Sequence, residues 1–402
     1  MKTGILLLLF SFFFIKSTGQ LFSVTGIVND SATLAPVSGA SVYLPNTTLG
    51  TITDTNGRFR IDHLPAGFYE LTVTHVAYHP LKFQLSSSFR PDSLYMRPKA
   101  GFLNPVVVRS KTKERSGSWK KWGAVFFDIV MGNSIYANSC RIENKEVVVF
   151  SYHKKNGILE ARTTAPLVIQ NAALGYTIYY ETDRFLRNEK TAETVSTGTL
   201  HFTEMKGDSS KQNTWRRNRA EVYKTSLLRF MRALYNNSLK QQGYSLYRLK
   251  SLKIADTVIL GNRTAAVTRA MGHIGNTFKT TVDSTEIQAG QITSPVDAQT
   301  VALNYPGTLL VRMADSLYSA PLVLDYLRSA SFLFFSRLQD AARMPAFKEL
   351  TNRISSMLYL DESPSLFIKP NGSYRKNSAL ITNGFFNWSE KVAMMLPLNY
   401  YP

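Results

Sequence analysis

The chain of 402 residues contains a single cysteine, Cys140. One cysteine excludes an intramolecular disulfide, so the fold has to be held together by its hydrophobic cores. Cys140 directly precedes an apolar segment, and this placement predicts a buried, unreactive thiol rather than a nucleophile. Bacterial lipid anchoring requires a cysteine at the signal cleavage point, and Cys140 lies far downstream of it. We therefore expect an unlipidated protein.

Long hydrophobic runs are confined to the first residues of the chain. Lys2 is followed by the apolar segment Ile5–Ile15 and then by small residues at Ser17–Gly19. This order is typical of a secretory signal peptide. We predict a signal peptide over residues 1–20 and an exported mature chain. No later segment is long and apolar enough to be a candidate transmembrane helix.

Acidic residues are scarce, with 28 Asp and Glu against 47 Lys and Arg, which gives a formal net charge of +19. The basic residues are densest in two stretches: Arg109, Lys111, Lys113, Arg115, Lys120 and Lys121, then Arg216, Arg217, Arg219 and Lys224. In an exported protein this charge favours an anionic lipid surface or an acidic polysaccharide over nucleic acid. A solvated surface without a specific partner is the simplest interpretation.

Motifs of several enzyme classes are missing. The sequence has no Gly-x-Ser-x-Gly elbow, no phosphate-binding glycine-rich loop and no EF-hand. Ser110-x-x-Lys113 has the spacing of a penicillin-recognising nucleophile, but it lies in a charged segment with no helical pattern. A carboxylate pair for glycoside hydrolysis stays open, because the separation of such a pair is a three-dimensional quantity.

The six histidines are scattered along the chain: His63, His75, His79, His153, His201 and His273. His201 and Glu204 have the His-x-x-Glu spacing of the metallocarboxypeptidase zinc site, and His273 is available as a third ligand. On an alternating strand, however, residues three apart face opposite sides. His75 and His79 would lie about 13 Å apart along a strand, too far to share one ion. We predict no catalytic, cofactor-binding or metal-binding residue and no cofactor.

Residues 21–109 have the pattern of a small all-β domain. Alternating segments bounded by turn residues follow one another closely: VTGIVND, GASVYLP, GTITDTNGRFRI and GFYELTVTHVAY. Asn56-Gly57 suits a two-residue type I′ hairpin turn, which requires positive φ at both positions. Phe59 and Ile61 point to one face, and the arginines beside them point to the other. Such closely spaced strands predict a β-sandwich.

Short motifs in this region occur in a characteristic order: Gly26-x-Val28, Pro36, Gly39-Ala40-x-Val42, Gly50-Thr51-x-Thr53-Asp54, Gly57-x-Phe59, Leu64-Pro65-x-Gly67-x-Tyr69 and Val106-Val107-Val108. The region resembles the carboxypeptidase regulatory-like domain. This resemblance implies a seven-stranded, immunoglobulin-like or transthyretin-like sandwich, as found at the N-terminus of TonB-dependent outer-membrane receptors. It implies no zinc ligand, because in metallocarboxypeptidases the module accompanies a separate catalytic domain. Ala77 departs from the glycine that the family usually carries there.

Residues 110–121 are charged and lack apolar periodicity, so we predict a linker. Residues 122–402 are too few for the plug and barrel of a receptor. They predict one β-rich domain with one prominent amphipathic helix from about 213 to 237. We place Arg216, Arg217, Glu221, Lys224 and Arg232 on the polar face of this helix. Further predicted strands include DTVIL, AAVTRAM, TLLVRMAD and SFLFFSRL, with a turn at Asn371-Gly372. The region resembles uncharacterised secreted bacterial proteins that carry the same N-terminal module.

The sequence as a whole predicts a mostly β protein of the bacterial cell envelope, either periplasmic, associated with the outer membrane or extracellular. It favours a non-catalytic binding or assembly module at the outer membrane. A polysaccharide-binding or polysaccharide-processing protein is the first alternative, and a zinc-dependent hydrolase is the second. The expected partner is an envelope protein or an anionic glycan or lipid surface, and nucleic acid is not expected.

Overall fold

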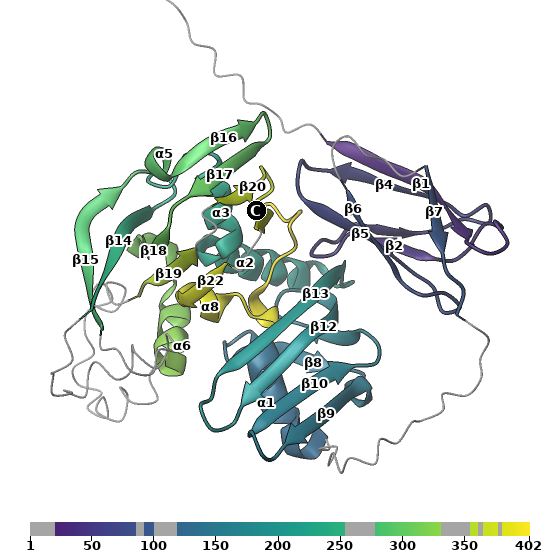
Figure 1. Ribbon diagram of the computed structural model, residues 1–402, viewed down its shortest axis with the longest axis horizontal. Helices are drawn as coiled ribbons and strands as arrows, with labels where there is room; N and C mark the ends of the chain where they lie inside the picture. Colours follow the sequence, from purple (N-terminus) through teal and green to yellow (C-terminus); the bar gives the residue numbers. More distant parts are fainter. Residues whose placement is uncertain are drawn as a thin grey trace, which may run out of the picture.

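The computed structural model describes residues 21–85, 92–99, 119–253, 278–330, 354–360, 365–376 and 380–402 (Figure 1). Several sequence predictions lie outside these residues: the signal peptide, Val106–Val108, Ser110 and Lys113, His273, and the strands DTVIL, AAVTRAM and SFLFFSRL. The buried apolar residues form two separate clusters. One lies in the N-terminal domain, and the other extends through the C-terminal region that begins at Trp119.

The N-terminal domain is a sandwich of two sheets. Its strands are β1 (Phe22–Asp30), β2 (Ser41–Tyr43), β3 (Gly50–Ile52), β4 (Arg58–Leu64), β5 (Tyr69–Thr74), β6 (Leu81–Leu85) and β7 (Ser93–Met96). One sheet has the order β4-β1-β7 and the other β3-β2-β5-β6. Alternate residues of both sheets, among them Val28, Val42 and Leu71, are fully buried between them. The predicted sandwich is confirmed.

The turn at Asn56-Gly57 differs from the predicted hairpin. It joins β3 and β4, which belong to different sheets, and of its two central residues only Gly57 has positive φ (+70°). The Asp54 side chain closes the turn, because Oδ1 accepts from the backbone N–H groups of Asn56 (2.9 Å) and Arg58 (2.8 Å). The type I′ prediction was therefore wrong, because Asn56 and Gly57 lie in a turn that the Asp54 side chain closes, as in an Asx turn.

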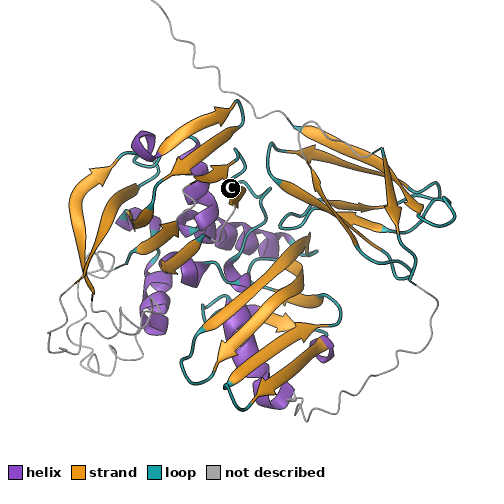
Figure 2. Cartoon of the chain, viewed as in Figure 1, coloured by secondary structure: helices purple, strands orange, loops and turns teal. Residues whose placement is uncertain are grey.

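The C-terminal region begins with helix α1 (Trp119–Met131) and a six-stranded antiparallel sheet. The strands of this sheet are β8 (Cys140–Ile142), β9 (Val148–His153), β10 (Ile158–Thr163), β11 (Leu167–Asn171), β12 (Tyr176–Asn188) and β13 (Thr194–Glu204). Phe126 of α1 packs on Phe150 of β9 and Phe185 of β12, with ring centroids 5.7 and 5.0 Å apart. Figure 2 shows α1 along one face of this sheet.

The rest of the region contains two further sheets and several helices (Figure 2). A five-stranded sheet has the order β15 (Phe278–Ile287), β14 (Tyr244–Lys253), β18 (Gly307–Met313), β19 (Ser356–Leu360) and β22 (Ile381–Gly384). A four-stranded sheet has the order β16 (Thr293–Asp297), β17 (Thr300–Asn304), β20 (Ser365–Ile368) and β21 (Tyr374–Lys376). Among the described residues, the helices of this part are α2 (Ser209–Thr225), α3 (Leu227–Tyr235), α5 (Ala289–Ile292), α6 (Ala320–Ala330) and α8 (Phe385–Ser389). The mostly β fold class is confirmed.

The helix predicted over 213–237 is two helices, α2 and α3. Ser226 interrupts it with extended backbone (ψ 152°), and its hydroxyl accepts from the backbone N–H of Arg229 at the start of α3 (3.2 Å). Serine competes for backbone hydrogen bonds in this way and therefore favours helix ends. The predicted polar face is also wrong in two members, because Arg232 is buried and Glu221 is half-buried.

Helix α1 begins inside the predicted linker, at Trp119. Lys120 and Lys121 are exposed, whereas Trp122 and Phe126 are buried against the sheet. The two lysines give the segment a charged composition, and this composition concealed the first helical turn.

Candidate functional site

The structure separates the residues of the predicted zinc motif. His201 and Glu204 point to opposite faces of β13: Glu204 pairs with Arg219 of α2 (3.0 Å), while His201 lies against Tyr43 of the N-terminal domain. His273, the third residue of the motif, lies outside the described residues. Within the described part of the chain, no three His, Cys, Asp or Glu side chains are grouped so as to hold a metal ion.

Cys140 is half-buried at the start of β8, with Sγ 3.5 Å from the carbonyl oxygen of Tyr136. Burial raises the pKa of this thiol to about 12. The thiolate is the reactive form, so we predict that a soluble disulfide reagent modifies Cys140 only after unfolding. Stopped-flow labelling at pH 8, with and without guanidinium, measures this difference. Immediate reaction of the native protein would contradict it.

The most extensive polar arrangement that the structure brings together is the domain junction, where the N-terminal domain contacts the C-terminal region. The loop Asn46–Thr48, between β2 and β3, lies beside β13. The Asn46 N–H donates to the Leu200 carbonyl (2.5 Å), and the Phe202 N–H donates to the Thr47 carbonyl (3.0 Å). The loop thus pairs with β13, which has β12 as its only partner strand among the described strands.

The other side of the same loop binds the C-terminal tail. The Leu398 N–H donates to the Asn46 carbonyl (2.7 Å). Asn399 and Thr48 form two further bonds, because Asn399 Oδ1 accepts from the Thr48 N–H (3.0 Å) and Asn399 Nδ2 donates to Thr48 Oγ1 (2.7 Å). The loop therefore lies between a strand and the tail, hydrogen-bonded to both.

A second contact joins the β4–β5 turn to the β20–β21 turn. Asn371 Nδ2 donates to the hydroxyl of Tyr69 (3.1 Å), and the Phe68 N–H donates to Ser373 Oγ (2.8 Å). Gly67 packs closely on this amide, since a Cβ atom at Gly67 would lie 2.2 Å from Asn371 Nδ2. Arg375 places its guanidinium 4.7 Å from the centre of the Phe68 ring.

Arg232 of α3 links the two segments of the C-terminal region that contact the N-terminal domain. Its side chain is 5% exposed and donates to the backbone carbonyls of Asn371 (3.0 Å), Leu398 (2.9 Å) and Tyr400 (2.9 Å). Its guanidinium also lies 4.0 Å from the ring centre of Tyr401. One buried cation thus orients both the β20–β21 turn and the tail that bind the N-terminal domain.

His201 lies in the domain junction, beside Tyr43 and Tyr179. Its ring lies 4.7 Å from Tyr43 and 6.2 Å from Tyr179 (centroid distances), and its Nδ1 is buried with no hydrogen-bond partner among the described atoms. The Tyr43 hydroxyl in turn donates to Glu181 (3.2 Å), and Glu181 pairs with Lys82 (3.4 Å). Burial lowers the pKa of His201, and the carbonyls of Leu44 and Thr47 oppose this only in part.

We predict that the protein loses stability through His201 as the pH falls. A lowered pKa means that the unfolded state binds more protons below about pH 6.5, so the free energy of unfolding decreases from there downward. His201→Phe keeps the stacking and removes this titration. Between pH 7.5 and 5.5 the wild type should lose about 1 kcal/mol more than His201→Phe in denaturant titrations. Equal losses would show that His201 does not contribute.

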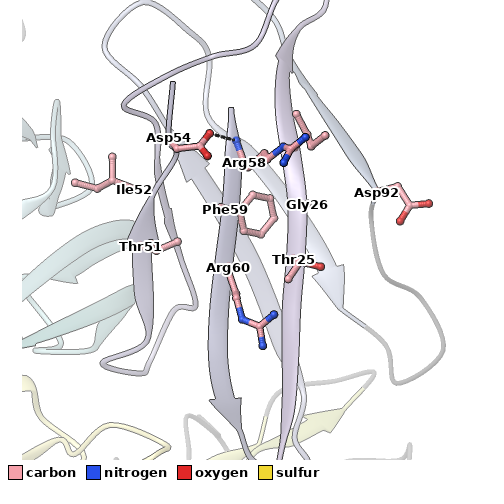
Figure 3. Close-up of a pocket in the computed structure, with 10 residues that line it drawn as sticks. Thr25, Gly26, Thr51, Ile52, Asp54, Arg58, Phe59, Arg60 and Asp92 are labelled. Atoms are coloured by element: carbon pink, nitrogen blue, oxygen red, sulfur yellow. Dashed lines mark hydrogen bonds between the residues drawn. The ribbon is translucent and has the colours of Figure 1, made fainter. Parts of the chain in front are cut away.

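A pocket lies on the N-terminal domain (Figure 3). A shallow pocket of about 750 Å³ extends over β3, β4 and β1. Its lining residues are Thr25, Gly26, Ile27, Thr51, Ile52, Asp54, Arg58, Phe59, Arg60 and Asp92. In Figure 3, Arg58 and Arg60 project from β4, with Thr51 of β3 on one side and Thr25 of β1 on the other. The hydrogen bonds, ion pairs and ring contacts found at the domain junction involve none of the pocket residues, within the described part of the chain.

Residues 24–108 match the family described as CarboxypepD_reg-like domain. The N-terminal domain is a carboxypeptidase regulatory-like domain. The match includes all seven strands from β1 to β7, apart from the first two residues of β1. The resemblance read from the motifs between Gly26 and Tyr69 is thereby confirmed. No curated protein matches the chain.

Solved structures give only distant likenesses. A chain of a type II cohesin–X-dockerin complex from Acetivibrio cellulolyticus is 29% identical over 18% of this chain and 51% of its own length, with a TM-score of 0.16. A membrane-associated protein of unknown function from Bacteroides fragilis is 11% identical over 72% of this chain and 87% of its own, also with a TM-score of 0.16. The chain thus spans about half the length of the first of these, and scores this low support no conclusion about fold or function.

Sequence reasoning identified the outward-facing arginines of the pocket but missed the junction. Asn46, Asn371 and Arg232 come from three distant parts of the chain, and no local pattern relates them. The one part of the junction that the sequence indicated is the Asn371-Gly372 turn. This turn is present as predicted, with Gly372 at φ +84°. Within the described residues, no helix is long and apolar enough to cross a membrane.

Proposed function

We propose that the protein is a non-catalytic binding or assembly protein of the bacterial cell envelope, acting at the outer membrane. The observation that carries this proposal is the way the regulatory-like domain is mounted. The loop Asn46–Thr48 and the Gly67–Tyr69 turn are fixed to the C-terminal region, while the pocket residues of the sheet β4-β1-β7 take no part in these contacts. A fixed domain with a free outer face suits presentation of a binding surface.

The envelope location rests on two further points. The regulatory-like domain is typical of envelope proteins. The first twenty residues have the order of a signal peptide, with Lys2 followed by an apolar run and small residues.

Fractionation of a bacterial host tests the location. The full chain, expressed with a C-terminal tag, should appear in the envelope fraction with its N-terminus near Leu21 by mass spectrometry. A photo-crosslinking residue in place of Tyr95, which is 51% exposed on β7, should then yield a specific adduct with an envelope component. Retention of the full-length chain in the cytoplasm would contradict the proposal.

Polysaccharide binding is the second candidate, and the pocket on β3, β4 and β1 is the specific feature that favours it. Its polar lining combines hydroxyl, carboxylate and guanidinium groups, which suit ligands that both donate and accept hydrogen bonds.

A further inference from the structure

The two arginines of the pocket differ in how far their charges are already satisfied. Arg60 is engaged by Asp62: Nε lies 2.8 Å from both carboxylate oxygens, and Nη2 lies 2.8 Å from Oδ1. The Arg58 guanidinium, in contrast, forms no hydrogen bond, ion pair or ring contact with any residue that the structure describes. Only its backbone N–H is bound, by the Asp54 side chain. Arg58 is thus an exposed guanidinium that lines the pocket and is available to an anion.

The groups around Arg58 favour a hydroxylated ligand. Thr25 and Thr51 contribute hydroxyls from β1 and β3, on either side of the strand that carries the arginine (Figure 3). Asp54 is exposed, and its Oδ1 is used by the turn. Ile27 and Ile52 supply apolar surface, and Ile52 is 67% exposed. Sugar rings combine hydroxyls at their rim with an apolar C–H face, so they match both kinds of group.

The shape and charge of the site argue against a membrane surface as its ligand. Binding to an anionic bilayer relies on several lysines or arginines on one exposed face, each adding about 1 kcal/mol. Here a single free guanidinium lies in a concave site beside the exposed carboxylates of Asp54 and Asp92. Asp54 and Asp92 can accept hydrogen bonds from the hydroxyl groups of a sugar that enters the pocket.

We infer that this pocket binds an acidic oligosaccharide, whose carboxylate pairs with Arg58 and whose hydroxyls contact Thr25, Thr51 and Asp54. The guanidinium fork matches a carboxylate in two parallel hydrogen bonds. The pocket volume of about 750 Å³ accommodates a short oligomer rather than a single sugar. This inference rests on the proposed binding role of the regulatory-like domain and specifies the ligand class for it.

Calorimetric titration of the mature chain with tetrasaccharides that carry one uronic acid residue tests the inference. Neutral tetrasaccharides and vesicles containing anionic lipid are the other arms. Acidic tetrasaccharides should bind, neutral ones at least tenfold more weakly, and Arg58→Gln should weaken acidic binding at least tenfold. Arg216→Gln removes the same charge from an exposed position on α2 and should leave binding unchanged. Thr51→Val should weaken binding several-fold without altering the fold.

Three outcomes would overturn the inference. Equal weakening by Arg58→Gln and Arg216→Gln would show that net charge alone attracts the ligand. Equal binding of neutral tetrasaccharides would remove the role of the carboxylate. Binding to the vesicles, with none to the acidic tetrasaccharides, would assign the surface to lipid. None of these outcomes contradicts the proposed location in the cell envelope, because fractionation and the position of the mature N-terminus test that location separately.

Discussion

Arg232→Met is expected to lower the free energy of unfolding by about 3 kcal/mol, because it leaves three backbone carbonyls, one buried and two partly buried, without their donor, at about 1 kcal/mol for each. These carbonyls belong to Asn371, Leu398 and Tyr400, which orient the two segments that contact the N-terminal domain. Methionine retains most of the apolar stem and its packing, so the loss reports on the hydrogen bonds. Chemical denaturation followed by tryptophan fluorescence and circular dichroism measures it.

Arg216→Met is the matched control for this substitution. Arg216 lies on the neighbouring helix α2 and is exposed, with one side-chain hydrogen bond to Asn213 (3.1 Å). Exposed positions of this kind change stability by about 0.5 kcal/mol or less. A similar effect of the two substitutions would mean that Arg232 does not organise the junction.

Gly67→Ala should disrupt the contact between the β4–β5 turn and the β20–β21 turn. A Cβ atom would lie 2.2 Å from Nδ2 and 2.7 Å from Cγ of Asn371, whose side chain is fully buried and hydrogen-bonded on both sides. Asn371 therefore cannot move aside without losing its bonds to Tyr69 and Ser373. We expect a loss of roughly 2 kcal/mol, typical of overpacking at a tight contact. We also expect the N-terminal domain to unfold in a transition of its own in calorimetry.

Gly290→Ala serves as the control, because a Cβ atom at Gly290 meets no atom within 4 Å. It lies in the short helix α5, where alanine is favoured over glycine, so stability should be unchanged or slightly higher. A single unchanged transition for Gly67→Ala as well would contradict the close packing between the two turns.

The sequence predicted those parts of the fold that depend on local patterns. Alternation at Phe59 and Ile61 correctly assigned the sandwich interior, where both side chains are buried. The motif order from Gly26 to Tyr69 correctly identified the family. The charged composition of residues 110–121 led to a wrong prediction at their C-terminal end. There α1 already begins at Trp119, next to two lysines.

The domain junction could not be predicted, because its contacts join residues far apart in the chain. Asn46 binds Leu200 on one side and Leu398 on the other. Arg232 was placed on a polar helix face, where arginine ordinarily belongs. It is buried because backbone carbonyls from two other segments converge on it, and no helical pattern reveals such carbonyls. A linker prediction likewise says nothing of whether the domains that it joins are docked.

The docking of the regulatory-like domain bears directly on the proposed function. A domain on a free tether would sample many orientations, and a ligand would have to restrict them at an entropic cost. Strand pairing by Asn46–Thr47, side-chain bonds at Asn371 and the ion pair of Lys82 with Glu181 remove this freedom in advance. The pocket around Arg58 is then presented in one orientation relative to the C-terminal region.

The most direct test is a distance distribution between the two parts of the protein. Asn56→Cys, in the β3–β4 turn, and Lys155→Cys, in the β9–β10 turn, are both exposed and can carry spin labels in a Cys140→Ala background. Pulsed dipolar spectroscopy of the doubly labelled protein should give one narrow distribution, which Gly67→Ala and Arg232→Met broaden. A broad distribution in the otherwise unchanged protein would contradict a fixed regulatory-like domain.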